Sequence, residues 1–460
     1  MRKNGFILLS ILFSLFLIVG CSSSKGSNES AATGQSPKSE QGQKQKEEEG
    51  EFEPVTLLMM THWNDEQFAT YFKEPVEAKF DHITLEHVQS RWDEIEENVF
   101  AKKLYPDLIM TSVSAEYLEM DLLLDLTPYI EETNFDLDRL EPSILNYLKE
   151  QSNEGELNGL PLIRPEYALV YNPDIFDLFG VDYPTDDMTW DEVIELAREV
   201  TGEMGGVHYR GLHPGNFDFM MRQTETPKLV DPDTHEPIID KNEAFKIYLQ
   251  RLEEIYAIPG NSFDSVEDMK DVRGVDLMRQ GQLAMAADRA FAGAYVGAAV
   301  ENGLNFDFVT YPRWGGEFGD YGPNEPGNGI VATTTSEHPR EAFRVIEYRE
   351  AFRVIEYLLS DEYQMIKSEN GDLPSVVTPE VREAFMKGHE HYEDILKDKN
   401  LAAITDVEAA PLPRISQYES EIMEEVDYRE GIFEGKDINT IIREMQDKAE
   451  GNAKSVLSKN

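Results

Sequence analysis

From Pro54 onward the sequence predicts an α/β fold with a parallel sheet. Short apolar runs alternate there with stretches in which apolar residues recur at helical spacing. Roughly 400 residues follow that point, which is enough for two or three domain-sized cores. Before it, the chain has one apolar run at the N-terminus and then a stretch with almost nothing to bury. The fold is therefore expected to begin near this proline.

The N-terminal segment has the layout of a secretory signal peptide over residues 1–20. Arg2 and Lys3 precede an apolar run at 6–19, which is short for a membrane-spanning helix. The ending at 17–21 resembles a bacterial lipobox, and the resemblance implies that Cys21 becomes the lipidated first residue of the mature protein. Cys21 is the only cysteine, so the chain has no disulfide framework.

Residues 21–53 are expected to form the lipidated start and a disordered tether. Ser, Gly, Gln, Lys and Glu dominate this segment, so it has little apolar surface to bury. A tether of this length suits a protein that must clear a membrane surface and a cell wall. We therefore expect the protein on the outer face of the cytoplasmic membrane of a Gram-positive bacterium, held there by its lipid alone.

The first α/β stretch follows the tether. The runs at 55–61, 83–89 and 107–112 are expected as strands, and each is followed by a stretch with helical periodicity. Asn64 or Asp65 is a suitable cap for the first of these helices. Strands and helices in this order favour right-handed βαβ units.

A second α/β stretch begins near residue 160 and includes an amphipathic helix that starts at 189. Further on, residues 231–240 are rich in turn formers. Their spacing lacks the glycine and the distal glutamate of a calcium-binding EF-hand loop. We expect a surface hairpin there.

A nine-residue segment is repeated almost perfectly, at 341–349 and again at 350–358. Nine residues rotate a continuous helix by about two and a half turns, so the apolar stripes of the two copies would face opposite sides. Both stripes cannot meet one core. We expect one copy to be packed and the other to be accommodated as a helix extension or bulge, without a function of its own.

The charge balance is strongly acidic, with 42 basic against 89 acidic residues and a formal net charge of -47. Nucleic acid is therefore excluded as a partner, and an anionic lipid surface is a poor one, because both need a basic face. A cationic ligand is one interpretation of the acidic residues. Their spread over the whole chain favours a solvated surface instead.

Four segments together resemble the family of extracellular solute-binding proteins that includes maltose-type receptors. They are 105–112 with its Pro-Asp-Leu run, 158–200 with Thr189 to Glu192 opening a helix, 278–291 around Gly281, and 327–364. The matches run in family order and weaken toward the C-terminus. The repeat at 341–358 and the pair Arg164–Pro165 depart from the family pattern.

The resemblance implies a two-lobed α/β fold of the type II periplasmic-binding-protein class, with hinge strands between the lobes. We place crossings at 163–166, 286–289 and 327–333. The first lobe would comprise 54–163 plus 288–332, and the second 164–287 plus 333–460. The ligand would lie in the cleft between the lobes, which close on it by a hinge motion.

A sugar site combines carboxylates, amides and arginines with aromatic rings. The residues expected to contact the ligand lie at strand ends and crossings: Trp63, Asp65, Ser112, Arg164, Glu166, Asp288, Trp314 and Tyr321. Maltose-type receptors place a hydroxyl-binding acid after the first crossing, and the resemblance assigns that role to Glu166. Trp314 lies in a Gly-rich loop, where a large aromatic side chain is costly to expose without a use.

Each of these residues also has a structural alternative. Trp63 can be a packing residue, Asp65 and Ser112 (with Ser114) can cap helices, and Glu166 can be one more surface acid. Arg164 can pair with Glu166 or contact an anionic ligand. Asp288 can form a hinge ion pair with Arg289, and Trp190, at a helix start, is expected in the core.

The function that the resemblance implies is that of a monomeric solute-binding component of an ABC importer, which captures a carbohydrate and delivers it to membrane permease subunits. The chain has no Gly-x-Ser-x-Gly, His-Glu-x-x-His or phosphate-binding Gly-Lys-Ser/Thr pattern, and its nine histidines show no metal spacing. We therefore expect no enzyme activity, no metal and no cofactor. The alternatives are a secreted polysaccharide-acting enzyme and a surface adhesin lipoprotein.

Overall fold

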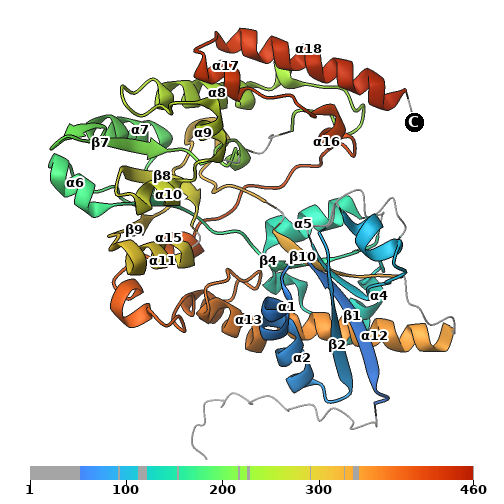
Figure 1. Ribbon diagram of the computed structural model, residues 1–460. Helices are drawn as coiled ribbons and strands as arrows, with labels where there is room; N and C mark the ends of the chain where they lie inside the picture. Colours follow the sequence, from blue (N-terminus) through green and yellow to red (C-terminus); the bar gives the residue numbers. More distant parts are fainter. Residues whose placement is uncertain are drawn as a thin grey trace, which may run out of the picture. The chain divides into compact units, whose positions relative to one another are not determined.

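The computed structural model describes residues 52–91, 94–111, 122–152, 155–215, 218–224, 228–290, 292–325, 327–334 and 341–458. Cys21, Ser112 and Ser114 lie outside these residues, as do the signal peptide and nearly all of the tether. The described chain contains two five-stranded sheets, each with its own hydrophobic core (Figure 1). The predicted α/β class is confirmed.

The first sheet has the strand order β2-β1-β3-β10-β4. Its strands are β1 (Val55–Thr61), β2 (Ile83–Gln89), β3 (Leu108–Thr111), β4 (Leu160–Ile163) and β10 (Asn328–Ala332). β1 lies parallel to β2 and β3, as the βαβ pattern predicts, whereas β10 is antiparallel to β3 and β4. The sheet is therefore mixed, and β10, a strand from late in the sequence, lies between β3 and β4.

The second sheet has the strand order β6-β7-β8-β5-β9. Its strands are β5 (Tyr167–Tyr171), β6 (Gly202–Met204), β7 (Val207–His213), β8 (Leu283–Arg289) and β9 (Asp307–Val309). β7 and β8 are parallel, and β5 is antiparallel to both of its neighbours. All five residues of β5 are buried, as expected for a central strand.

The first lobe consists of the first sheet and the helices that share its core. These are α1 (Asp65–Phe68), α2 (Glu74–Lys79), α4 (Thr127–Thr133), α5 (Pro142–Gln151), α12 (Glu341–Leu358) and α13 (Asp361–Glu369). A π-helical stretch (Ala69–Lys73) joins α1 to α2. Asn64 is the cap of α1, because its side chain accepts from the Gln67 N–H at 2.9 Å and the Gln67 side chain accepts from the Asn64 N–H.

The second lobe carries more helices. They are α6 (Pro173–Phe179), α7 (Trp190–Glu199), α8 (Glu243–Tyr256), α9 (Val266–Asp271), α10 (Gly274–Arg279), α11 (Ala292–Asn302), α15 (Ala402–Thr405), α16 (Glu419–Ile422), α17 (Arg429–Phe433) and α18 (Ile438–Leu457). Thr189 and Glu192 form a capping box at the start of α7. Trp190 is 1% exposed, so its predicted place in the core is confirmed.

The lobe boundaries differ from those expected in two places. Residues 288–309 belong to the second lobe, because β9 pairs with β5 and α11 packs into the second core. The segment that follows β10 belongs to the first lobe, because Phe352 and Ile355 of α12 are buried in the first core. The chain re-enters the second lobe at α14 (Pro379–Glu383), between Val381 of the first core and Phe385 of the second.

The expected crossings need the same correction. The segment 163–166 does join the sheets, since it links β4 to β5. In contrast, 286–289 is the end of β8 and stays in the second sheet. The second crossing is instead the long link 310–327 between β9 and β10. Gly327 ends this link with φ +60°, and a Cβ there would collide with the carbonyl of Ile163, so glycine allows the link to pass against β4.

The repeated segment forms one continuous helix, α12 (Figure 1). In its second copy Ala351, Phe352, Val354 and Ile355 are buried in the first core. The expectation that one copy is packed in the core is thus confirmed for the second copy. The side chains of 341–347 lie outside the described residues. The expected hairpin is also present, since Val230 and Pro237 form an antiparallel bridge around the turn. No helix of the described residues is long and apolar enough to span a membrane.

Candidate solute-binding site

A large cavity of about 1010 Å³ is lined by residues of the links between the lobes and of both lobes. The 163–166 link contributes Arg164, Pro165 and Glu166, and the 310–327 link contributes Glu325 and Gly327. The second lobe adds side chains from the end of β8, the start of α10 and the start of α11. The first lobe adds Asn328 of β10 and the residues after α13. This volume is sufficient for a small solute such as an oligosaccharide.

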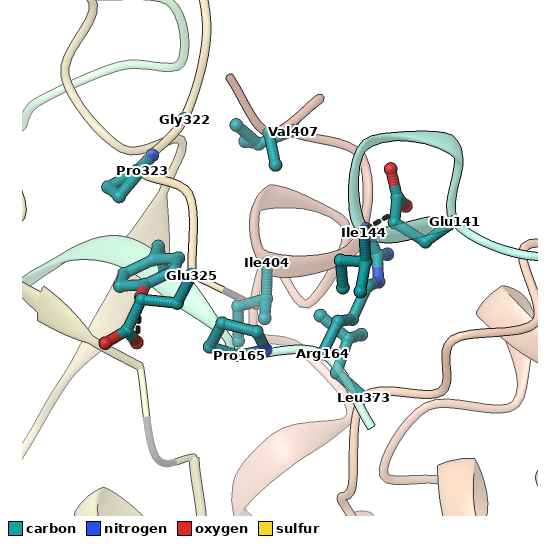
Figure 2. A pocket seen from close by; sticks show the side chains of 12 residues that line it. Glu141, Ile144, Arg164, Pro165, Gly322, Pro323, Glu325, Leu373, Ile404 and Val407 are labelled. Atoms are coloured by element: carbon teal, nitrogen blue, oxygen red, sulfur yellow. Dashed lines mark hydrogen bonds and ion pairs between the residues drawn. The ribbon is translucent and has the colours of Figure 1, made fainter. Parts of the chain in front are cut away.

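A second, much smaller cavity of about 30 Å³ lies against the same link and is shown in Figure 2. Arg164 and Glu141 face one another on one side of it, and Glu325 lies on the other side beyond Pro165 (Figure 2). Its volume accommodates one or two water molecules and no solute. Arg164 donates to Glu141 at 3.2 Å and to the carbonyl of Thr405 at 2.9 Å, so it ties the first lobe to a C-terminal segment of the second.

The large cavity is lined by four arginines and four carboxyl groups. They are Arg164, Arg222, Arg273, Arg289, Glu166, Asp288, Glu325 and Asp372. Two of the arginines share one carboxylate, because Arg222 (3.2 Å) and Arg289 both donate to Glu325. The Tyr167 hydroxyl donates to the same group at 2.5 Å. Glu325 thus connects η5 (Met221–Gln223), β8 and β5 at one point of the wall.

Glu166 lies on the link with its carboxyl group largely enclosed by protein atoms. Burial, reinforced by the negative charge of Asp372, raises the pKa of Glu166 to about 8. The Ala292 N–H, which donates to Glu166 at 3.5 Å, and the cations Arg164 and Arg289 act in the opposite direction without cancelling the shift. At neutral pH the Glu166 carboxyl group is therefore protonated in most molecules, and in that form it can donate a hydrogen bond into the cavity.

Asp288 shows a smaller effect of the same kind, since burial raises its pKa to about 6. Its carboxylate accepts from the Arg289 backbone N–H at 2.7 Å. The Arg289 guanidinium pairs with Glu325. The sequence suggested an ion pair between Asp288 and Arg289, and the partner of Arg289 is instead Glu325.

Asp372 is held from behind by a buried lysine. Lys367 of α13 is 3% exposed and pairs with Asp372. Its ammonium lies 3.7 Å from the Tyr71 ring centroid and 5.1 Å from that of Trp63. Trp63, predicted to contact the ligand, thus contacts Lys367 and is not among the residues that line the large cavity.

The structure brings three of the predicted site residues together in the cavity wall: Arg164, Glu166 and Asp288. Asp65 lies elsewhere, with its side chain 90% exposed and paired with His87 at 2.7 Å. Trp314 packs against the second core, and its indole N–H donates to the Met220 carbonyl at 2.8 Å. Tyr321 lines neither cavity, and its carbonyl accepts from the Gln223 amide.

Sequence reasoning missed Arg222, Arg273, Glu325 and Asp372, which complete the charged wall. They come from four segments far apart in the sequence, and none lies in a recognisable pattern. Among the described residues no cluster of His, Cys, Asp or Glu could hold a metal ion.

The model of the family described as bacterial extracellular solute-binding protein matches residues 63–365. A binding protein of Brucella abortus (strain 2308) is 22% identical over 304 residues, which is 60% of this chain and 66% of the relative. The chain thus matches slightly less than two thirds of the length of this relative. The family model ends its match at residue 365, before the C-terminal helices of the second lobe.

Solved structures share the fold over most of the chain. A sugar transporter from Rhizobium etli, in an open conformation, has a TM-score of 0.67 at 17% identity, covering 86% of this chain and 99% of the other. The sugar-binding protein MalE from Xanthomonas citri has a TM-score of 0.65 at 16% identity, covering 87% and 98%. A Listeria monocytogenes ABC substrate-binding protein in complex with cycloalternan has a TM-score of 0.62 at 18% identity, covering 86% and 98%.

The matched family and the similar structures are solute-binding proteins rather than enzymes, in agreement with the sequence-based expectation. The family is extracellular, which places the folded part outside the cytoplasm. Because the family model matches more than half of the chain, the chain belongs to the bacterial extracellular solute-binding protein family.

Proposed function

We propose that this protein captures a carbohydrate in the large cavity and presents it to the permease of an ABC importer. The observation that carries the proposal is the cavity itself: about 1010 Å³, lined by both lobes and by the two links between them. The sugar complexes of proteins with the same fold support a carbohydrate as the solute.

The polar groups of the wall suit a polyol. The carboxyl oxygens of Asp372 can accept from hydroxyl groups, Glu166, with its pKa raised to about 8, can donate to them, and the arginines can donate in pairs. A ligand that contacts both lobes at once binds the closed arrangement more tightly than any open one. Its differential affinity therefore shifts the population toward the closed form that a permease would recognise.

We propose further that Cys21 carries the lipid and that residues 21–53 tether a monomer to the outer face of the cytoplasmic membrane of a Gram-positive bacterium. The lipobox-like ending at 17–21 supports the anchor. Replacing Cys21 by Ser in the expressing bacterium should release the protein into the medium. Retention of the variant in the membrane fraction would contradict lipid anchoring.

The test of the carbohydrate proposal is a thermal-shift screen of the chain from Ser22 onward against mono- and oligosaccharides, polyamines and peptides. Since micromolar binding corresponds to about 8 kcal/mol at standard state, a saturating sugar should raise the melting temperature by several degrees. Chromatography of the sugar after incubation should show it unchanged. A shift with peptides or polyamines alone would contradict the carbohydrate, and a consumed sugar would contradict a receptor.

A further inference from the structure

Arg222 reaches the large cavity from a very short element. It lies on η5 (Met221–Gln223), its side chain is 38% exposed, and its guanidinium donates to Glu325 of the wall at 3.2 Å. A 3₁₀ turn of three residues has few hydrogen bonds of its own, so neighbouring segments must fix the direction of its side chains. The position of Arg222 therefore depends on contacts made outside the cavity wall.

The link between β9 and β10 holds one side of this turn. Gln223 is fully buried, and its amide donates to the carbonyls of Pro312 at 2.6 Å and Tyr321 at 2.8 Å. The backbone N–H of Asn324 donates to the Arg222 carbonyl at 3.0 Å. These bonds join η5 to the segment that also supplies the carboxylate partner of Arg222.

Asp218 holds the other side of the turn. Its carbonyl accepts from the backbone N–H groups of Met221 at 2.9 Å and Arg222 at 3.2 Å, so it starts η5. Asp218 itself has φ +59°, a left-handed backbone conformation that few side chains adopt and that persists only where contacts hold it. The conformation that starts η5 therefore has to be stabilised by contacts of Asp218.

Two tyrosine hydroxyls make those contacts. Tyr248 of α8 donates to the Asp218 carboxylate at 2.7 Å, and Tyr428, just before α17, donates to the same oxygen. Both tyrosines are buried. Burial and the charge of Asp218 raise the pKa of both hydroxyls well above the ordinary value, so both remain donors. Arg429 adds a longer contact with the same carboxylate at 3.4 Å.

The same tyrosines also belong to the packing between α8 and α17 (Figure 1). If they only stabilised that packing, their aromatic rings would be enough, and neither η5 nor a bound solute would respond to the loss of a hydroxyl. Both hydroxyls instead converge on the residue whose own carbonyl starts η5. This convergence favours a role in placing Arg222.

We propose that Asp218 is a positioning residue for solute binding: held by the hydroxyls of Tyr248 and Tyr428, it fixes the turn that directs Arg222 into the large cavity. Asp218 is not among the residues that line this cavity. The inference rests on the proposed function, because it adds three residues behind the wall of the same site. Tyr428 lies beyond residue 365, where the family match ends, so the C-terminal part of this chain helps to shape its solute site.

Hydrogen–deuterium exchange of the chain from Ser22 onward, without a solute, tests the hold on the turn. The double variant Tyr248→Phe with Tyr428→Phe keeps both rings and removes both hydroxyls. Backbone amides in 219–224 should then exchange about tenfold faster, because hydrogen bonds to a charged group are lost and the turn opens more often. Asp218→Asn, which keeps an acceptor oxygen and tolerates a left-handed φ, should give a smaller increase.

The matched control is Tyr183→Phe, which removes another tyrosine–aspartate hydrogen bond of the second lobe, the one of 2.8 Å to Asp177. It should leave exchange in 219–224 unchanged. Cooperative melting of each variant shows that it is folded.

Calorimetric titration tests whether the turn matters to the solute, with maltotriose and mannotriose as probes. The double tyrosine variant should bind a probe at least about fivefold more weakly than the wild type does, because a misdirected Arg222 forfeits a charge-assisted hydrogen bond. Tyr183→Phe should bind it as the wild type does. In an Arg222→Ala background the two tyrosine substitutions should cause no further loss, because they act through Arg222.

The outcomes keep this inference and the proposed function apart. Unchanged exchange in 219–224 would overturn the inference whether or not a saccharide binds. Faster exchange at unchanged affinity, or a loss that persists in full in the Arg222→Ala background, would also overturn it and leave the tyrosines a purely structural role. If neither trisaccharide nor any saccharide of the thermal-shift screen bound the folded wild type, the proposed function would fall. Faster exchange would then still support the hold of Asp218 on Arg222, and unchanged exchange would overturn it.

Discussion

The two cavities that the Arg164–Pro165 link lines share part of their walls but differ greatly in volume. Both are lined by Arg164, Pro165 and Glu325. The small cavity, about 30 Å³, lies where Arg164 is buried and paired with Glu141. The large one, about 1010 Å³, is also lined by Arg222 and Arg289, whose side chains are 38% and 35% exposed. The buried pairing around the small cavity therefore stabilises the fold, while the large cavity is available to a ligand.

This difference predicts that substitutions around the small cavity change stability, whereas substitutions around the large cavity change affinity. The largest effect is expected for Arg164→Ala, which leaves Glu141 buried without its cation. The free energy of unfolding should fall by about 3–5 kcal/mol. Urea unfolding measures it. The double variant Arg164→Met with Glu141→Leu should recover most of this loss. A loss below about 1 kcal/mol in Arg164→Ala would show that the Arg164–Glu141 pair does not stabilise the fold.

Trp314 tests the same difference between stability and affinity, because it was expected in the site and lines neither cavity. Trp314→Ala removes an indole that packs on Phe318 at 5.7 Å between ring centroids and donates to Met220. Unfolding should become easier by about 2–4 kcal/mol, with ligand affinity unchanged within about twofold. Loss of affinity at unchanged stability, in paired melts and titrations, would return Trp314 to the binding site.

Lys367 lies behind the large cavity and should affect binding through Asp372. Lys367→Met keeps an apolar chain against Trp63 and Tyr71, and Asp372, at 31% exposed, can still be solvated, so stability should change by less than about 1 kcal/mol. Affinity should fall by about tenfold, because Asp372 loses the partner that orients it. The matched control is Lys79→Met, another lysine above a tyrosine ring and far from the cavity, at 5.4 Å from the Tyr357 centroid. Equal losses in both variants would contradict the prediction.

The smallest effect concerns pH. Glu166 has a folded-state pKa of about 8, above its usual value of 4.5. The stability that this group contributes is therefore complete below pH 4.5 and is lost as the pH rises through about 8. Between pH 6 and pH 7 the wild type should lose on the order of 1 kcal/mol more than Glu166→Gln, which stays neutral throughout. Parallel loss in both proteins, followed by denaturant midpoints, would show that Glu166 does not carry this dependence.

The predictable elements of the fold are those that local sequence patterns mark. The capping box at Thr189 and the amphipathic pattern behind it define α7, and the apolar runs define β1, β2, β3 and β5. The apolar run of β8 wrongly predicted a strand that crosses between the lobes. Both strands that pair with β8, β5 and β7, lie in the second sheet. The true crossing, 310–327, is rich in glycine and proline and gives no strand pattern.

Residues of the large cavity were predictable only within segments that resemble the family. Arg164, Glu166 and Asp288 line the large cavity and lie at segments that the resemblance singled out. Arg222, Glu325 and Asp372 come from irregular segments, and in a chain with 89 acidic residues two further acids carry no signal. Their role depends on tertiary contacts, such as the shared pairing of two arginines with Glu325, which no local spacing encodes.

The most direct test of the account is to fill the large cavity without disturbing the small one. Gly293 lies at its wall in α11, and an added Cβ there meets no atom within 4 Å. Gly297, one turn further along α11, is equally open and lies outside the wall. Melting temperatures of the wild type, Gly293→Trp and Gly297→Trp are compared with and without a saturating saccharide. The account predicts a ligand-induced rise in the wild type and in Gly297→Trp but none in Gly293→Trp; an undiminished rise in Gly293→Trp would show that the solute binds elsewhere.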